Sequence, residues 1–117
     1  MTASRPACVY KICPRRDWEA AQAAGAFTGA GIDLADGYIH LSTAAQVRET
    51  ARLHFRGQPN LALLEVETAA LDADLRYEAS RGGALFPHLY APLPVAAVRR
   101  VWFLTLDAAG APRIPEL

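Results

Sequence analysis

The chain has 117 residues, in which twelve basic side chains balance twelve acidic ones, so the formal net charge at pH 7 is zero. Hydrophobic residues make up 52% of the sequence and charged residues 21%, which is typical of a folded globular protein and excludes a disordered chain. The length predicts a single domain over residues 1–117. Nucleic acid is possible as a partner, but the balanced charge does not indicate it.

The expected localisation is cytoplasmic. No run approaches the roughly 18 apolar residues that a membrane span requires, and residues 1–6 lack the apolar core of a signal peptide. Cys8 and Cys13 lie five positions apart on a predicted strand, so their side chains should point to opposite faces. That arrangement suits neither a disulfide between them nor a shared metal site, and two reduced thiols are the simplest account.

The first half of the chain is predicted to contain two strands and two helices. Residues 7–13 form an apolar strand, and the alanine-rich residues 17–24 form a helix that ends at Gly25. A glycine-bearing loop follows and leads to a short strand around His40. The second helix is expected over residues 44–55.

The second half is predicted to be mostly strand. Residues 61–67 are nearly all apolar, which indicates a central strand buried on both faces. The other expected elements are a turn of helix at 68–71, a strand at 75–78, a tight glycine loop at 80–83, a strand at 85–90, a closing strand at 99–106 and a loose tail after residue 107. Five or six short strands with two early helices predict an α+β domain.

His40 is the first candidate site residue. It lies at the end of a predicted strand, and Ser42 and Thr43 follow it where the next helix begins, with Gln46 completing a capping box. A helix N-terminus with hydroxyl groups beside a histidine suits an anionic or sugar-bearing ligand. A core histidine with two capping hydroxyls explains the same residues, and both interpretations remain open.

A second candidate cluster contains Glu78, Arg81, Phe86, His88 and Tyr90. Arg81 precedes two glycines, so it can bring a guanidinium and backbone amides to a phosphate, or else form a surface ion pair with Glu78. On a strand, Phe86, His88 and Tyr90 share one face, where an aromatic ring can stack on a base or pack in the core.

Lys11 on the first strand suits a phosphate better than a core. No metal is expected, because His40, His54 and His88 show no paired spacing and neither cysteine has a nearby partner. The sequence also contains no serine-nucleophile elbow, no Gly-x-Gly-x-x-Gly and no Walker-type phosphate loop. These absences exclude most of the common enzyme classes.

Over nearly its whole length the chain resembles the bacterial family called domain of unknown function 952. The residues that carry the resemblance are 9–12, 36–43, 63–66 and 80–90.

The same segments resemble, more distantly, the RNA 2′-phosphotransferases and the wider ADP-ribosyltransferase superfamily. The corresponding segments are Tyr10-Lys11-Ile12-Cys13, Ile39-His40-Leu41-Ser42, Leu64-Glu65-Val66-Glu67 and Arg81-Gly82-Gly83. This resemblance implies an ADP-ribosyltransferase-like fold of two small, mostly antiparallel sheets that form a cleft for NAD. The chain departs from that superfamily on the first strand, where Lys11 and Ile12 replace a histidine and a glycine.

Three functions follow from these residues. The first is a transferase or hydrolase that acts on a nicotinamide dinucleotide, with His88, Glu78 and His40 as catalytic residues. Its ligand-binding residues are Lys11, His40, Ser42, Thr43, Arg81, Phe86 and Tyr90. The second is a module that binds a nucleotide or an ADP-ribose-like ligand without turnover, and the third is a two-histidine phosphoesterase. The sequence does not predict an oligomeric state.

Overall fold

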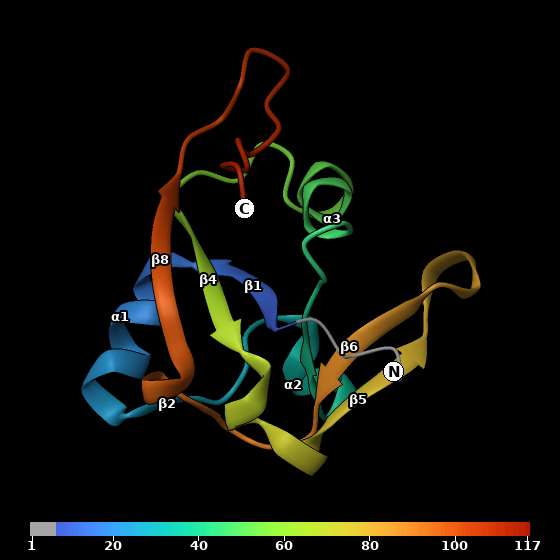
Figure 1. Ribbon diagram of the computed structural model, residues 1–117. Coiled ribbons are helices and arrows are strands. Elements are labelled where there is room, and N and C mark those ends of the chain that lie inside the picture. Colours follow the sequence, from blue (N-terminus) through green and yellow to red (C-terminus); the bar gives the residue numbers. More distant parts are fainter. Residues whose placement is uncertain (1–6) are drawn as a thin grey trace.

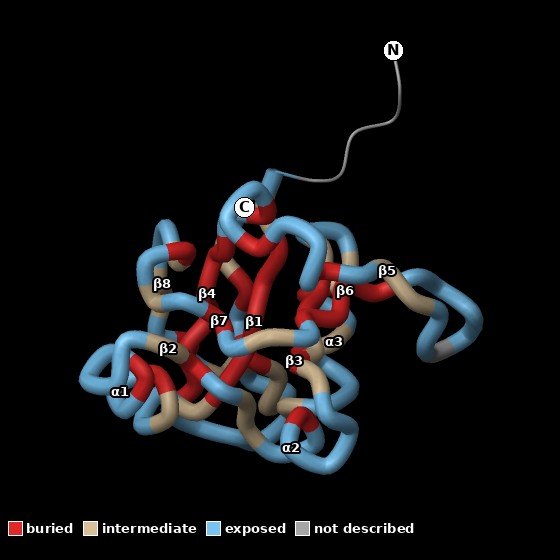
Figure 2. The backbone as a smooth tube through the Cα atoms, turned by 90° about the horizontal axis from the view of Figure 1, so that it is seen from below, coloured by how far each residue is buried: buried red, intermediate tan, exposed pale blue. Residues whose placement is uncertain are grey.

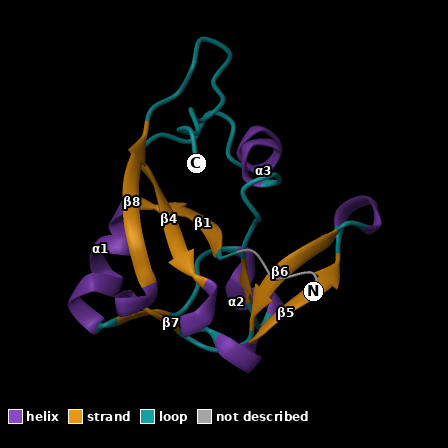
Figure 3. Ribbon diagram, in the orientation of Figure 1, coloured by secondary structure: helices purple, strands orange, loops and turns teal. Residues whose placement is uncertain are grey.

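The computed structural model describes residues 7–117, apart from the side chain of Arg81. Residues 1–6, on which the signal-peptide argument depends, lie outside this range. The elements in chain order are β1 (Cys8–Pro14), α1 (Arg15–Ala24), β2 (Ala26–Phe27), α2 (Ile32–Asp36), β3 (Ile39–His40), α3 (Val47–His54), β4 (Leu61–Glu67), β5 (Leu75–Ala79), β6 (Leu85–Leu89), β7 (Leu93–Pro94) and β8 (Val98–Leu104) (Figures 1 and 3). Short 3₁₀ helices cover Thr68–Ala70, Asp72–Asp74, Arg81–Gly83 and Val95–Ala97. The predicted α+β class is confirmed.

The described strands form small antiparallel sheets. One has the order β1-β4-β8, a second has the order β3-β6-β5, and β2 pairs with β7. Residues 61–66 of β4 are all buried between two neighbouring strands, as the apolar run predicted. A bridge between Tyr10 and Ser42 joins the first two sheets, because each backbone N–H donates to the other residue's carbonyl, at 2.8 and 2.9 Å. This bridge fixes the position of β3 relative to β1.

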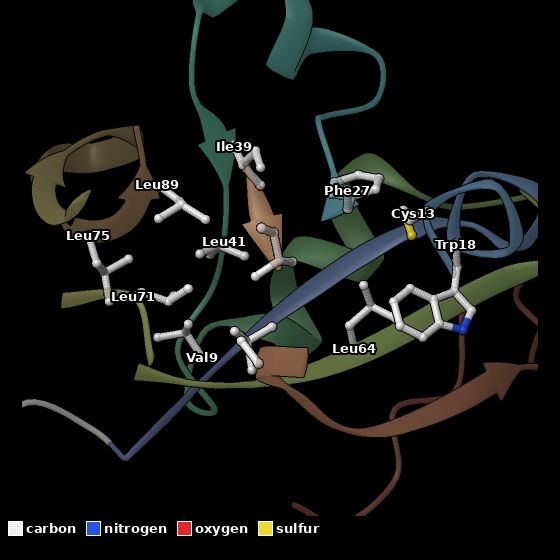
Figure 4. Packing of buried hydrophobic residues seen from close by; sticks show 14 of the residues in the cluster. Val9, Cys13, Trp18, Phe27, Ile39, Leu41, Leu64, Leu71, Leu75 and Leu89 are labelled. Atoms are coloured by element: carbon white, nitrogen blue, oxygen red, sulfur yellow. The ribbon is translucent and has the colours of Figure 1, made fainter. Parts of the chain in front are cut away.

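The main hydrophobic core fills the space between the two three-stranded sheets. Val9 of β1, Leu64 of β4 and Leu41 of the segment after β3 all contribute side chains to this core, where Leu64 lies beside Trp18 (Figure 4). Trp18 packs into the same core from α1, whose other side is exposed. In Figure 2 the buried positions concentrate along β1 and β4, whereas the helices are largely exposed. The core is therefore built mainly on the inner strands.

A second core cluster lies on the other face of the first sheet. Tyr10 and Ile12 pack there with Val47 of α3 and with Ile114 from the C-terminal segment. Arg48 of α3 also donates a hydrogen bond to the Ile114 carbonyl, at 3.2 Å. The sequence predicts a loose tail after residue 107; in the structure this segment packs in the second core as far as Ile114 and covers the end of the sheet beside α3 (Figure 1).

The helices differ from the prediction in two places. Helix α2 occupies the predicted glycine loop, so the described residues contain three α-helices where two were expected. Five residues are too few for a periodic apolar pattern, which explains why the sequence does not indicate this helix. Helix α3 begins at Val47 instead of residue 44, and the Gln46 side chain accepts a hydrogen bond from the Thr43 amide at 3.1 Å. Among residues 7–117 no helix has the length and apolar character needed to cross a membrane.

Candidate functional site

A cleft of about 740 Å³ is lined by β1 from the first sheet and by β3 and β6 from the second, together with residues of α2 and α3. Its volume lies in the range of small-molecule sites, roughly 300–1,000 Å³. His40 and His88 both line it. The structure thus brings together the two histidines that the sequence singled out in separate segments.

Asp33 of α2 is the buried anchor of this cleft, and the sequence analysis did not identify it. Its Oδ2 lies 2.7 Å from Lys11 Nζ and accepts the Ala30 amide at 3.1 Å. Its Oδ1 accepts the His40 amide at 3.0 Å and lies 2.7 Å from His40 Nδ1. Burial alone would raise the pKa of this carboxyl, but the Lys11 charge and the hydrogen bonds from Lys11 and His40 lower it below its ordinary value. Asp33 is therefore ionised at neutral pH.

His40 is held between two carboxylates. Its Nδ1 faces Asp33, and its Nε2 lies 2.9 Å from Asp36 Oδ2. The His40 carbonyl accepts a hydrogen bond from Lys11 Nζ at 3.0 Å. The side chain is 28% exposed, and its two ring nitrogens contact carboxylates, not the backbone. These contacts exclude the alternative in which His40 is a core histidine whose ring is hydrogen-bonded to the backbone.

His88 lies directly opposite His40, because the two residues are paired in register across β3 and β6. Their ring centroids are 5.5 Å apart. His88 is buried, and its Nδ1 lies 2.9 Å from Glu78 Oε1 on the neighbouring strand β5. Each histidine of the pair is thus oriented at Nδ1 by its own carboxylate.

Glu78 also accepts a hydrogen bond from the Tyr90 hydroxyl, at 2.6 Å. The bonds from Tyr90 and then His88 lower the pKa of the Glu78 carboxyl, and the same carboxylate raises the pKa of Tyr90. The predicted common face of His88 and Tyr90 is confirmed by their shared partner. Tyr90 itself does not line the cleft, and neither does Thr43.

Tyr38 covers the histidine pair. Its ring stacks on His88 at 4.3 Å between centroids with 28° between the planes, and it lies 4.6 Å from the His40 ring. The sequence analysis did not identify Tyr38 as a site residue. The available signal was its place in the segment from Asp33 to His40, which carries two carboxylates and a tyrosine within seven residues of His40.

The remaining predicted ligand-binding residues differ in how far they can reach a ligand. Ser42 and Phe86 line the cleft, and the Ser42 hydroxyl donates to Thr50 Oγ1 at 3.0 Å. Lys11 also lines it, but its ammonium group is buried against Asp33. The Arg81 side chain, which was predicted to hold a phosphate, lies outside the described part of the structure.

The first-strand wall of the cleft contains Tyr10 and Ile12. The Tyr10 hydroxyl donates to Glu65 Oε2 at 2.9 Å, and burial, reinforced by Glu65, raises the pKa of Tyr10 to about 12. Tyr10 is therefore neutral in the physiological range. Within residues 7–117 no group of three histidine, cysteine or acidic side chains is arranged to hold a metal ion.

The sequence matches the family described as protein of unknown function, DUF952, over residues 12–101. The crystal structure of protein CC0527 from Caulobacter crescentus is 57% identical, with a TM-score of 0.88, and the match covers 91% of this chain and 93% of that one. A crystal structure of a double mutant of CC0527 is 56% identical over 91% of this chain and 93% of that one, again with a TM-score of 0.88. The solution NMR structure of CC0527 is 56% identical over 92% of this chain and 93% of that one, with a TM-score of 0.82. No curated protein matches.

Proposed function

This chain belongs to the DUF952 family, and we propose that it binds a nicotinamide dinucleotide or an ADP-ribose-like ligand with the ribosyl end at His40 and His88. One observation carries the proposal: two histidines, each oriented by a carboxylate, lie side by side on the wall of a cleft of about 740 Å³. The antiparallel sheets on either side of this cleft also support the proposed ADP-ribosyltransferase-like arrangement.

The charges around the pair favour this kind of ligand. Three carboxylates contact the two histidines, those of Asp33, Asp36 and Glu78, whereas the Lys11 ammonium pairs with Asp33, so with neutral imidazoles the surroundings of the pair are negative. A negative environment stabilises a group that is cationic or develops positive charge. When the bond from ribose to nicotinamide breaks, the bonding electrons leave with nicotinamide and the ribosyl carbon becomes cation-like.

The proposed catalytic roles follow from position. His88 is the proton-transfer group, because Glu78 holds its Nδ1 and imidazole is the most common general acid–base group in enzymes. Glu78 does not line the cleft, so in the proposal its carboxylate supports the cation-like ribosyl group through His88. His40 with Ser42 binds the ribose. Phe86 offers a ring for stacking, and Arg81 remains the proposed ligand of the diphosphate.

Lys11 takes a different role in the proposal. Its Nζ lies 2.7 Å from Asp33 and 3.0 Å from the His40 carbonyl, so its charge is already neutralised. It therefore supports His40 and does not bind a phosphate. A cytoplasmic location also belongs to the proposal, supported by the free thiols of Cys8 and Cys13, which pack on opposite faces of β1.

The two-histidine phosphoesterase is the second candidate, because one specific observation favours it. The ring centroids of His40 and His88 are only 5.5 Å apart, which is close enough for both to contact one phosphate. Against it stands the excess of carboxylates around the pair, since a phosphate anion would be repelled unless both imidazoles were charged. We therefore rank it below the dinucleotide.

A thermal-shift measurement with NAD, ADP-ribose and a 2′,3′-cyclic nucleotide tests the proposal. We expect NAD or ADP-ribose to raise the melting temperature of the wild type, and the increase to disappear in His40→Ala and His88→Ala. Arg52→Ala is the control, because Arg52 is exposed and pairs with Glu49 on the outside of α3. Nicotinamide release then separates an enzyme from a binding module. A shift with the cyclic nucleotide alone would select the phosphoesterase, and no shift with any ligand would reject the proposal.

A further inference from the structure

We infer that Asp33 is the positioning residue of the cleft, because it selects the His40 tautomer in which Nδ1 carries the proton and Nε2 faces the ligand. This inference deepens the proposed function and rests on it for the identity of the ligand. Its structural part stands on the contacts of Asp33 alone.

The tautomer follows from the chemistry of the buried carboxylate. An ionised carboxylate only accepts hydrogen bonds, so a ring nitrogen 2.7 Å from Asp33 Oδ1 must donate a proton to it. The same oxygen accepts the His40 amide at 3.0 Å, so the ring and the main chain of one residue are held by one atom. The Asp33 side chain is 1% exposed, which leaves it little freedom to turn away.

Lys11 completes the arrangement from a different strand. Its ammonium group neutralises Asp33 at 2.7 Å and also donates to the His40 carbonyl at 3.0 Å. Residue 40 is therefore held on both sides, by the Asp33 carboxylate and by the Lys11 ammonium. Through these contacts, β1, α2 and β3 meet at a single histidine.

Asp36 provides the contrast within the same helix. It contacts the other ring nitrogen, Nε2, at 2.9 Å, but its side chain is 37% exposed. Both ring nitrogens face a carboxylate, but a neutral imidazole has a single N–H to donate. We infer that buried Asp33 keeps that proton on Nδ1, and that the exposed Asp36 side chain then turns away from the lone pair of Nε2. Once Asp36 has turned away, Nε2 can accept a proton from a ligand hydroxyl. The other polar or charged groups near the ring are Lys11, Tyr38 and His88.

Nitrogen-15 NMR of the imidazole rings tests the inference directly. In the wild type, at a pH where His40 is neutral, we expect a protonated Nδ1 and an unprotonated Nε2. Asp36→Asn is the matched variant, because it removes the carboxylate at the other nitrogen of the same ring, and we expect it to keep this tautomer. Asp33→Asn should lose the proton at Nδ1, since its amide no longer requires a donor there.

NAD titration of the same samples measures the consequence for binding. We expect Asp33→Asn to weaken NAD binding on the order of tenfold, by analogy with carboxylates that orient histidine ligands. Asp36→Asn should weaken it by a smaller factor.

A neutral His40 with its proton on Nε2 in the wild type would overturn the inference, as would an Asp33→Asn variant that keeps Nδ1 protonated. If Asp33→Asn does not fold, the wild-type and Asp36→Asn spectra decide the tautomer without it. If NAD does not bind the wild type while the tautomer is as expected, the proposed function fails and the positioning role of Asp33 stands.

Discussion

At the scale of single residues, the site depends on a buried ion pair. Asp33 and Lys11 are 3% and 6% exposed, so neither charge is well hydrated, and each is tolerated because the other lies 2.7 Å away. Such a pair adds little stability compared with apolar residues, but removing one partner leaves an uncompensated buried charge. The pair therefore serves position more than stability.

Asp33→Asn should lower the free energy of unfolding at pH 7 by about 3–5 kcal/mol, because it leaves the Lys11 ammonium buried without its counter-charge. The pKa of Asp33 is lower in the folded protein than in the unfolded chain, so its stabilising contribution is present above the unfolded value of 3.8. That contribution is lost as the pH falls through the folded value. Urea unfolding measures this at pH 7 and below pH 3.8. We expect the free energies of unfolding of wild type and variant to differ less at the lower pH.

Folding also lowers the carboxyl pKa values of Glu78 and Asp107. Because wild type and Asp33→Asn both contain these two carboxyls, the difference between the two proteins isolates the effect of Asp33. A difference between the two proteins that stays constant over this pH range would contradict the expected role of the ion pair.

At the scale of elements, the segment around α2 is shaped by glycine. Gly29 has φ +121°, and a Cβ placed there would lie 3.0 Å from Asp33 Cβ and 3.3 Å from Leu34 Cδ2. Residues with side chains rarely adopt this φ value. A Cβ at this position would also lie closer to Asp33 Cβ than side-chain atoms normally approach each other. Gly29 therefore allows the chain to pass close to the anchor of His40.

Gly29→Ala should destabilise the protein by roughly 1–3 kcal/mol and should also change the NMR signals of His40, because Asp33 must move. Gly25→Ala is the control. Gly25 ends α1 with φ +89°, and nothing lies within 4 Å of a Cβ built there, so its substitution strains only the backbone. We expect a cost of about 1 kcal/mol and unchanged His40 signals in the control. Equal effects of both variants on His40 would show that Gly29 has no special relation to Asp33.

The C-terminal segment acts as part of the second core. Ile114 is 9% exposed and packs with residues of β1, α3 and β4. Ile114→Ala should lower the free energy of unfolding by about 2 kcal/mol or more, as expected for truncating a buried aliphatic side chain. Leu117→Ala, at a position that is 41% exposed, should change it by less than about 0.5 kcal/mol. Chemical denaturation of both variants checks this, and an Ile114→Ala variant as stable as wild type would mean that the segment does not contribute to the core.

At the scale of the whole molecule, the cleft exists because two sheets meet at one short bridge. Tyr10 and Ser42 exchange backbone hydrogen bonds there, so β1 and the segment after β3 become neighbours (Figure 1). The walls of the cleft come from strands whose other residues fill the main core. Opening the first sheet therefore opens the core and the site together.

Cys13 reports on that opening. It is fully buried in β1, and burial raises the pKa of its thiol to about 12, so it is protected from thiol reagents in the folded protein. In a Cys8→Ser background, we expect a thiol reagent to label Cys13 at a rate that follows the global unfolding equilibrium as urea is added. Rapid labelling in the absence of urea would show that β1 opens locally, without unfolding of the rest.

The sequence by itself determined the α+β class, the buried central strand over residues 61–67 and the identity of His40 and His88 as site candidates. These features depend on local information: runs of apolar residues, turn residues and the chemistry of individual side chains. Only the tertiary structure decided that His40 and His88 lie opposite each other, and that Lys11 faces Asp33 instead of the open cleft. It also revealed Asp33, Asp36 and Tyr38 as members of the site. Strand register and ion pairing between distant segments depend on how the sheets pack, and periodicity along one chain carries no information about which strands become neighbours.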